Sequence, residues 1–284
     1  MKITYDKKIE NKTFSAERAL YMLRGAYVKN CRFEGEEDGE SAFKEGADIL
    51  AEACFYDLRY PFWHDKNLVI RGGEMTQKCR AALWYDEDVE IEGCCMHGIK
   101  ALRECKRVNM TNCDVISPEF GWNCSFLSVK GGAITSEYAF MNGKNITLDG
   151  VTFTGKYSFQ YNENLHIRNS VLNTKDAFWH VKHAVIEDSE VNGEYLGWYS
   201  EALTLVRCKI RGTQPLCYCK RLTLIDCTME GCDLAFEYSD VQATVHSKID
   251  SVKNVRSGKV VAKSFGEIIR SESVYPVEAE LKEE

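Results

Sequence analysis

Two short motifs, more than a hundred residues apart, place the same aromatic and titratable side chains next to each other. The segments YPFWHDK (60–66) and DAFWHVK (176–182) both contain a Phe-Trp-His triplet, followed one residue later by a Lys. An imidazole can act as an acid or base near neutral pH, and a tryptophan ring offers a flat apolar face. Each of the two motifs therefore places a group capable of acid/base chemistry beside an aromatic ring.

Two groups of residues are candidates for acid/base chemistry on a glycan. In the first group, Glu104 would act as acid or base and Arg103 would stabilise developing negative charge, with Lys100 and Glu119 beside them. Glycosidases need two carboxyl groups roughly 5 to 9.5 Å apart, and sequence spacing alone does not give the distance between Glu104 and Glu119.

The second group lies at the second motif and combines a histidine with a tyrosine. Here His180 would act as the base and Tyr199 as the proton donor, with Asp176 and Trp179 completing the group. A ladder of solvated charged residues on a repeat surface is the alternative interpretation for both groups.

The elements that position these residues follow from an internal repeat. Nine units, among them NLVIRGGEM (67–75), NITLDGVTF (145–153) and RLTLIDCTM (221–229), begin 21 residues apart once and 19 residues apart seven times. The second and fourth positions of each unit are apolar, the sixth is usually Gly, Asn or Asp, and the seventh is small. This pattern predicts a strand, a sharp bend and a second short strand.

A third segment, rich in aromatic residues and glycine, completes each unit and disfavours a helical return. Three short strands per 19-residue coil predict an all-β, single-stranded, right-handed parallel β-helix of roughly 11–12 coils. We expect an N-terminal cap over residues 1–25, the β-helix over 26–274 and a C-terminal tail over 275–284.

Aligning the coils brings both motifs to the same place in the repeat. All five tryptophans of the chain fall at position sixteen, and both motif histidines fall at position seventeen. The candidate binding residues in these two columns are Trp63, His64, Trp84, Tyr85, Trp122, Asn123, Tyr161, Trp179 and Trp198.

The direction in which this column faces is open from sequence. Aromatic stripes are common in cores, and the Trp column could complete the packing of one corner. However, neighbouring residues of a strand point to opposite faces, and a buried column of His, Glu and Asn would need a partner for each polar atom. An exposed groove of rings and polar tips would instead suit a sugar ligand.

Composition excludes several other classes of function. The net charge of −7 gives no basic surface for nucleic acid, and no stretch has the length and apolarity of a signal sequence or membrane span. We therefore expect a cytoplasmic protein without a cofactor. Five of the thirteen cysteines fall at position seven, where a small buried residue is needed, and no zinc-type spacing is present, so no metal is expected.

Almost the whole chain, from FSAERALY (14–21) to GEII (266–269), resembles an uncharacterised bacterial family of single-stranded right-handed β-helix proteins with a pectin-lyase-like fold. The segments that carry the resemblance include RYPFWH (59–64), CRAALWYDE (79–87), GKYSFQY (155–161) and GEYLGWYSE (193–201). The resemblance implies the fold and its handedness but no activity. The chain lacks an obvious cluster of three acidic residues with an arginine for calcium-assisted elimination.

The sequence thus leads to two functional hypotheses from different classes. The first is a carbohydrate-binding or carbohydrate-active protein that uses the aromatic face for an oligosaccharide, and that would be a hydrolase or lyase if it is an enzyme. The second is a non-catalytic scaffold that docks a protein partner, or a second copy of itself, through the same face.

Overall fold

The computed structural model describes residues 3–35 and 40–284, which form two compact units, Met1–Lys144 and Asn145–Glu284. Every regular element within these described ranges is a β-strand, and none is a helix. Accordingly, no helix in the described part of the chain is long and apolar enough to cross a membrane.

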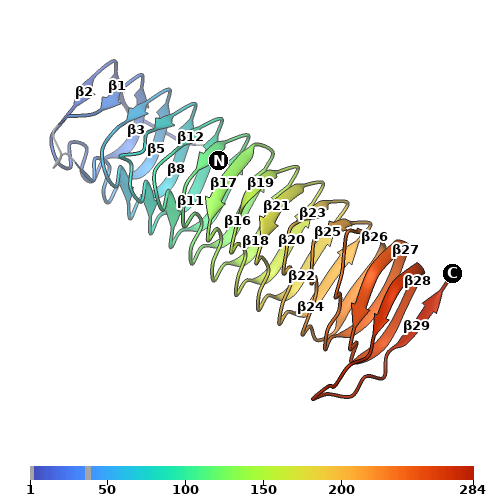
Figure 1. Ribbon diagram of the computed structural model, residues 1–284. Helices are drawn as coiled ribbons and strands as arrows, with labels where there is room; N and C mark the ends of the chain where they lie inside the picture. The colour runs from blue at the N-terminus through green and yellow to red at the C-terminus, as the bar shows by residue number, and fades with distance from the viewer. Residues whose placement is uncertain (1–2, 36–39) are drawn as a thin grey trace. The chain divides into compact units, whose positions relative to one another are not determined.

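Each unit is a parallel β-solenoid in which successive coils place equivalent strands side by side (Figure 1). In the first unit, one face is formed by the longer strands β1 (Lys7–Glu10), β3 (Arg24–Lys29), β5 (Ala47–Glu52), β8 (Lys66–Arg71), β11 (Glu87–Glu92), β14 (Lys106–Thr111) and β16 (Ser125–Lys130). The second face is formed by β2 (Thr13–Phe14), β4 (Arg32–Phe33), β6 (Phe55–Tyr56), β9 (Glu74–Met75), β12 (Cys95–Met96), β15 (Asp114–Ile116) and β17 (Ala133–Glu137). A third, minimal sheet consists of β7 (Phe62–Trp63), β10 (Leu83–Trp84) and β13 (Leu102–Arg103).

The second unit repeats the first two faces of this plan, with longer strands at its C-terminal end. Its first face holds β18 (Lys144–Asp149), β20 (Glu163–Arg168), β22 (Lys182–Glu187), β24 (Glu201–Val206) and β26 (Leu222–Glu230). The second face holds β19 (Thr152–Lys156), β21 (Val171–Lys175), β23 (Glu190–Asn192) and β25 (Lys209–Arg211). The unit ends with β27 (Asp240–Lys253), β28 (Ser257–Ile269) and β29 (Glu280–Glu283).

The predicted repeat sets the register of the coils. Leu68 and Ile70 on β8 pair with Val89 and Ile91 on β11, and all four side chains are buried. Since equivalent positions of successive repeats stack above one another, each apolar position becomes a continuous column in the core. This burial of apolar area is the main force that holds neighbouring coils together.

The sharp bend and the small buried residue of each coil are confirmed as well. Gly93, at position six, has a left-handed backbone with φ of 60°, and Cys94, at position seven, is 1% exposed. The Cys94 thiol donates a hydrogen bond to the carbonyl of Ile70, and its burial raises the pKa of that thiol to about 12. A thiol with such a pKa is inert, as a structural role requires.

The two units together contain about 14 coils, more than the 11–12 expected. The difference comes from the terminal segments, which also contribute parallel strands. β1 pairs with β3 inside the stretch expected as a cap, and β29 pairs with β28 inside the stretch expected as a tail. Residues 1–2 of the expected cap lie outside the described residues.

Candidate functional site

The aromatic segment of each coil forms a tight corner, which we call the aromatic corner and which spans residues 176–180 in the second motif. Asp176, Phe178 and His180 have left-handed backbones, with φ of 51°, 63° and 58°. Bulky residues rarely adopt this conformation because Cβ approaches the following carbonyl. Here it directs the N–H of His180 to the carbonyl of Trp198 in the next coil, at 3.0 Å.

In the second motif, left-handed residues set the direction in which the corner side chains point. Phe178 is 1% exposed and faces the core, Trp179 is half-buried, and His180 is exposed. The same order of buried, half-buried and exposed residues holds for Phe62, Trp63 and His64. The Trp column is therefore neither sealed in the core nor fully free, and the residues of position seventeen line its outer side.

In the first unit, the corner side chains form a short ladder of stacked rings. The rings of Trp63 and Trp84 lie 5.3 Å apart and those of His64 and Tyr85 lie 5.0 Å apart, each pair 9° from parallel. The ammonium of Lys44 covers Trp63, 3.8 Å from its ring centre. Because the rings cover one another, mainly their edges reach solvent within this ladder.

The second unit carries a longer ladder of the same kind. The ring of His180 lies between those of Tyr161 and Tyr199, at 4.9 and 5.2 Å, and Tyr199 stacks on Tyr218 at 4.8 Å. Beside them, Trp179 stacks on Trp198 at 5.5 Å. Tyr161 and Tyr199 are 53% and 46% exposed, so this ladder forms a ridge of ring edges on the surface of the unit.

The indole N–H groups divide the tryptophans into two sets. Trp179 donates to the carbonyl of Tyr195 at 2.7 Å, Trp198 donates to that of Gln214 at 2.8 Å, and Trp122 donates to that of Tyr138. In contrast, the buried N–H groups of Trp63 and Trp84 have no hydrogen-bond partner. Unpaired buried donors are uncommon in folded proteins. Both tryptophans of the second-unit ladder have a hydrogen-bonded indole N–H, whereas neither tryptophan of the first-unit ladder does.

The ladder of the first unit stops after Tyr85, and the next coil supplies charged residues in place of rings. The residues Lys100, Arg103, Glu104 and Glu119, which the sequence singled out, do lie together at this point. We call them the ladder gap. β13 carries Arg103 and pairs with β10, so that Arg103 stands in register with Trp84.

Within the ladder gap, two carboxylates lie on either side of one guanidinium. Arg103 Nε lies 3.8 Å from Glu104 Oε1, and Arg103 Nη1 lies 3.9 Å from Glu119 Oε2. The ammonium of Lys100 lies 3.2 Å from Glu119 Oε2, and Asn123 donates a hydrogen bond of 2.8 Å to Glu104 Oε1. The four charged side chains are between 21% and 26% exposed, so solvent and ligands can reach them.

The second predicted group is arranged differently. His180 and Tyr199 are neighbours, but they stack face to face, so the contact between them is through the rings. Asp176 is 9% exposed, and burial raises the pKa of its carboxyl above the ordinary value. Among the described residues, no hydrogen bond or ion pair joins Asp176 to His180.

Two buried aspartates were not among the candidate residues predicted from the sequence. Asp65 and Asp86, each 0% exposed, follow the corner at position eighteen, and desolvation raises the pKa of each carboxyl well above its ordinary value. Asp65 Oδ1 accepts from the N–H of Gly46, and Asp86 Oδ1 accepts from that of Asp65 at 2.7 Å. Cys105 and Cys124 occupy position eighteen in the next two coils and are buried. From these cysteines, burial of Asp65 and Asp86 could have been predicted.

The solved structures to which this protein is similar share little sequence identity with it. The A-module of the mannuronan C-5 epimerase AlgE4 of Azotobacter vinelandii has 7% identity and a TM-score of 0.34, over 98% of this chain and 91% of that one. PfbA, a surface adhesin of Streptococcus pneumoniae, has 8% identity and a TM-score of 0.36, over 87% and 70%. The receptor-binding tailspike of bacteriophage Det7 has 10% identity and a TM-score of 0.31, over 95% and 73%.

At these TM-scores the likenesses carry no argument about activity. The sequence matches none of the curated proteins with which it was compared. A family model does match it over residues 7–281, nearly the full length of the chain. The chain therefore belongs to the protein family of unknown function DUF3737.

Proposed function

We propose that the protein binds a carbohydrate at the ladder gap and that it binds without catalysing a reaction. The observation that carries this proposal is the interruption of the aromatic ladder. Stacked rings end at Trp84 and Tyr85, and a cluster of charged and amide side chains follows at once. A sugar needs both a flat apolar face and convergent polar groups.

Tyr85 supplies the apolar face. Its ring stacks on His64 and lies beside Trp84, and no further ring among the described residues stacks on it. Tyr85 is 42% exposed, and the next coil places Glu104 rather than a ring at the same position. The ring can therefore contact the apolar face of a sugar at the end of the ladder.

The charged residues of the ladder gap supply the polar contacts. The carboxylates of Glu104 and Glu119 accept hydrogen bonds from sugar hydroxyls, and the guanidinium of Arg103 donates them. Hydrogen bonds to charged groups contribute about 1.5 to 3 kcal/mol each when they are well formed. Three such groups within one coil spacing give a sugar several directional contacts.

The ion pairs of the ladder gap favour binding over catalysis. A general acid must be free to reach the oxygen of the leaving group, whereas the carboxylates of the ladder gap are already engaged by cationic neighbours. Glu119 lies close to both Lys100 and Arg103, and Glu104 lies close to Arg103. Both carboxylates are thus arranged as hydrogen-bond acceptors.

The test is a glycan-array screen followed by calorimetry with the best oligosaccharide, alongside an assay for its turnover. We expect Tyr85→Ala to weaken binding roughly two- to tenfold, because stacking contacts contribute about 0.5 to 1.5 kcal/mol. We expect Glu104→Gln to weaken it about tenfold or more. The matched control is Tyr199→Ala, which removes a similarly exposed tyrosine from the same coil position in the second unit and should leave affinity unchanged.

The proposal fails if no glycan binds, or if Tyr85→Ala and Glu104→Gln bind as tightly as wild type while remaining folded. Turnover that is lost in Glu104→Gln would instead make the ladder gap an active site.

A docking face for a protein partner or a second copy of the chain is the second candidate function. The observation that favours it is the ridge in the second unit, where His180 and Tyr199 each lie between two stacked rings and present only their edges and polar tips. Edge-exposed aromatic rows suit a protein surface better than a sugar ring. Sedimentation velocity of wild type and Tyr199→Ala tests it, since self-association through the ridge should weaken in the variant.

A further inference from the structure

One cysteine of the chain differs from all the others. Twelve of the thirteen cysteines are buried, whereas Cys95 is half-buried. Each of the twelve donates its thiol hydrogen to a backbone carbonyl, as Cys113 does to Ile91. Among the described residues, the thiol of Cys95 has no hydrogen-bond partner. The packing role that accounts for the other cysteines therefore does not account for Cys95.

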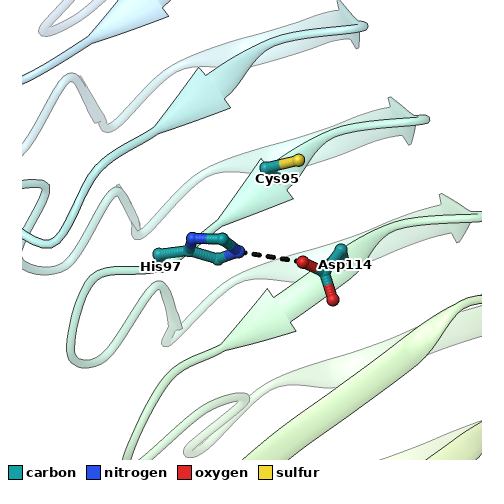
Figure 2. Close-up of side chains that lie close together, drawn as sticks. All are labelled: Cys95, His97 and Asp114. Carbon is teal, nitrogen blue, oxygen red and sulfur yellow. Dashed lines mark hydrogen bonds and ion pairs between the residues drawn. The ribbon is translucent and has the colours of Figure 1, made fainter.

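Two further side chains, of types that can bind metal ions, lie close to this thiol (Figure 2). His97 follows Cys95 by two residues, and Asp114 stands directly opposite Cys95 on the neighbouring strand β15. The sulfur of Cys95, a ring nitrogen of His97 and a carboxylate oxygen of Asp114 all lie within 4.8 Å of one another. In the described part of the chain, this is the one group of three such donors.

The backbone holds the three residues in place. β12 pairs in register with β9 on one side and with β15 on the other, and the N–H of His97 donates to the carbonyl of Met75 at 2.9 Å. His97 Nε2 already lies 2.9 Å from Asp114 Oδ2. Cys95 and Asp114 are carried by paired strands, and His97 directly follows one of them. Donors on regular elements are more precisely positioned than donors on loops.

From these observations we propose that Cys95, His97 and Asp114 bind a first-row transition metal ion, with Zn²⁺ as the best fit. A thiolate and an imidazole are ligands for zinc and its neighbours, whereas calcium and magnesium prefer oxygen alone. Zinc bonds of about 2.0 to 2.3 Å place ligand atoms roughly 3.3 to 3.7 Å apart. The side chains reach that spacing by small torsional changes, because they lie on the surface of the unit.

The donor set leaves one coordination position open. Three protein ligands with a free fourth position are typical of zinc sites that take up water or a ligand, whereas structural sites are closed by four protein ligands. Glu74 stands next to Cys95 on β9 but lies outside the cluster. The site therefore offers a metal ion with an accessible position, on a different part of the coil from the ladder gap.

The experiment titrates the EDTA-treated, reduced protein with ZnCl₂ by calorimetry, and with CoCl₂ while thiolate-to-cobalt absorption is recorded. We expect one equivalent to bind, with thiolate-to-cobalt absorption that disappears in Cys95→Ser. We expect His97→Ala and Asp114→Asn to bind at least about 10-fold more weakly, since removing even outer partners of metal ligands costs about 10- to 100-fold.

The matched control is His166→Ala. His166 Nε2 lies 2.8 Å from Glu187 Oε1, so this pair repeats the His–carboxylate contact without a cysteine. The control should bind zinc as wild type does. A second readout is the rate at which iodoacetamide alkylates Cys95, followed by mass spectrometry. Zinc should lower this rate, and EDTA should restore it.

The proposal is overturned if zinc does not bind, if Cys95→Ser keeps wild-type affinity, or if zinc fails to protect Cys95 from alkylation. Thermal unfolding of each variant without metal checks that the fold is intact. Since the twelve other thiols are buried, thiolate absorption that persists in Cys95→Ser would place the metal elsewhere and would also overturn it.

Discussion

The buried carboxyl group of Asp86 makes the stability of the first unit depend on pH in an unusual direction. Desolvation raises the pKa of this fully buried group well above its ordinary value. Its Oδ1 accepts the N–H of Asp65, while its Oδ2 has no partner. At pH values between the two pKa values, the folded protein therefore holds a proton that the unfolded chain, with an Asp pKa of about 3.9, has already released.

The sign of the effect follows from this difference. Because the folded-state pKa is the higher one, the contribution of Asp86 to stability is fully present below about pH 3.9 and is lost as pH rises through the folded-state pKa. Over that window, each such carboxyl lowers the free energy of unfolding by up to about 1.4 kcal/mol per pH unit. Asp65 adds to the effect, since its pKa is raised by desolvation and by the charge of Asp86.

The assay is urea unfolding of wild type and Asp86→Asn at pH values from about 4 to 8. Asn keeps the oxygen that accepts from Asp65 but does not ionise, so the variant should gain stability relative to wild type as pH rises. The control is Asp188→Asn. The hydrogen bond from Arg207 lowers the pKa of Asp188, so its contribution is lost as pH falls. Parallel pH profiles for wild type and Asp86→Asn would refute the reasoning.

Two further predictions concern the fold and use the same urea unfolding assay. At Gly193, a Cβ atom would lie 1.6 Å from the carbonyl oxygen of Thr174, whereas at Gly150 it would meet nothing within 4 Å. We expect Gly150→Ala to lower the free energy of unfolding by about 1 to 2 kcal/mol, because the backbone at this residue is left-handed, and Gly193→Ala to lower it by more than about 4 kcal/mol. Equal losses in the two variants would contradict the predicted clash at Gly193. Phe178→Ala should lower the free energy of unfolding by about 3 to 5 kcal/mol, because the ring of Phe178 stacks on that of Phe159 at 5.0 Å in the core. A loss below about 1 kcal/mol would show that the column of core rings does not depend on Phe178.

Much of the fold could be predicted from the sequence, because a strict period leaves few choices. Alternation at Leu68 and Ile70 identified the buried face of a strand, and small residues such as Cys94 identified the bend. The terminal coils were missed because their strands, such as β1 and β29, lack the full repeat and were taken for a cap and a tail.

The candidate sites show where local spacing is not enough. The place of Arg103, Glu104 and Glu119 in the repeat predicts that they are near one another, but only the tertiary structure shows that the guanidinium lies between the two carboxylates. Cys95 and Asp114 are 19 residues apart and therefore share a column. A search for short zinc motifs misses such a pair, because a solenoid brings donors together across coils.

The sequence by itself determined which residues stack on which between residues 67 and 229, because there the repeated pattern of apolar, turn and small residues sets the register of the coils. It thus placed YPFWHDK and DAFWHVK at equivalent positions of the coil. Only the tertiary structure decided which way those side chains face. At the aromatic corner of the second motif, left-handed residues such as Phe178 and His180 replace simple strand alternation. There the phenylalanine faces inward, the tryptophan is half-buried and the histidine is exposed.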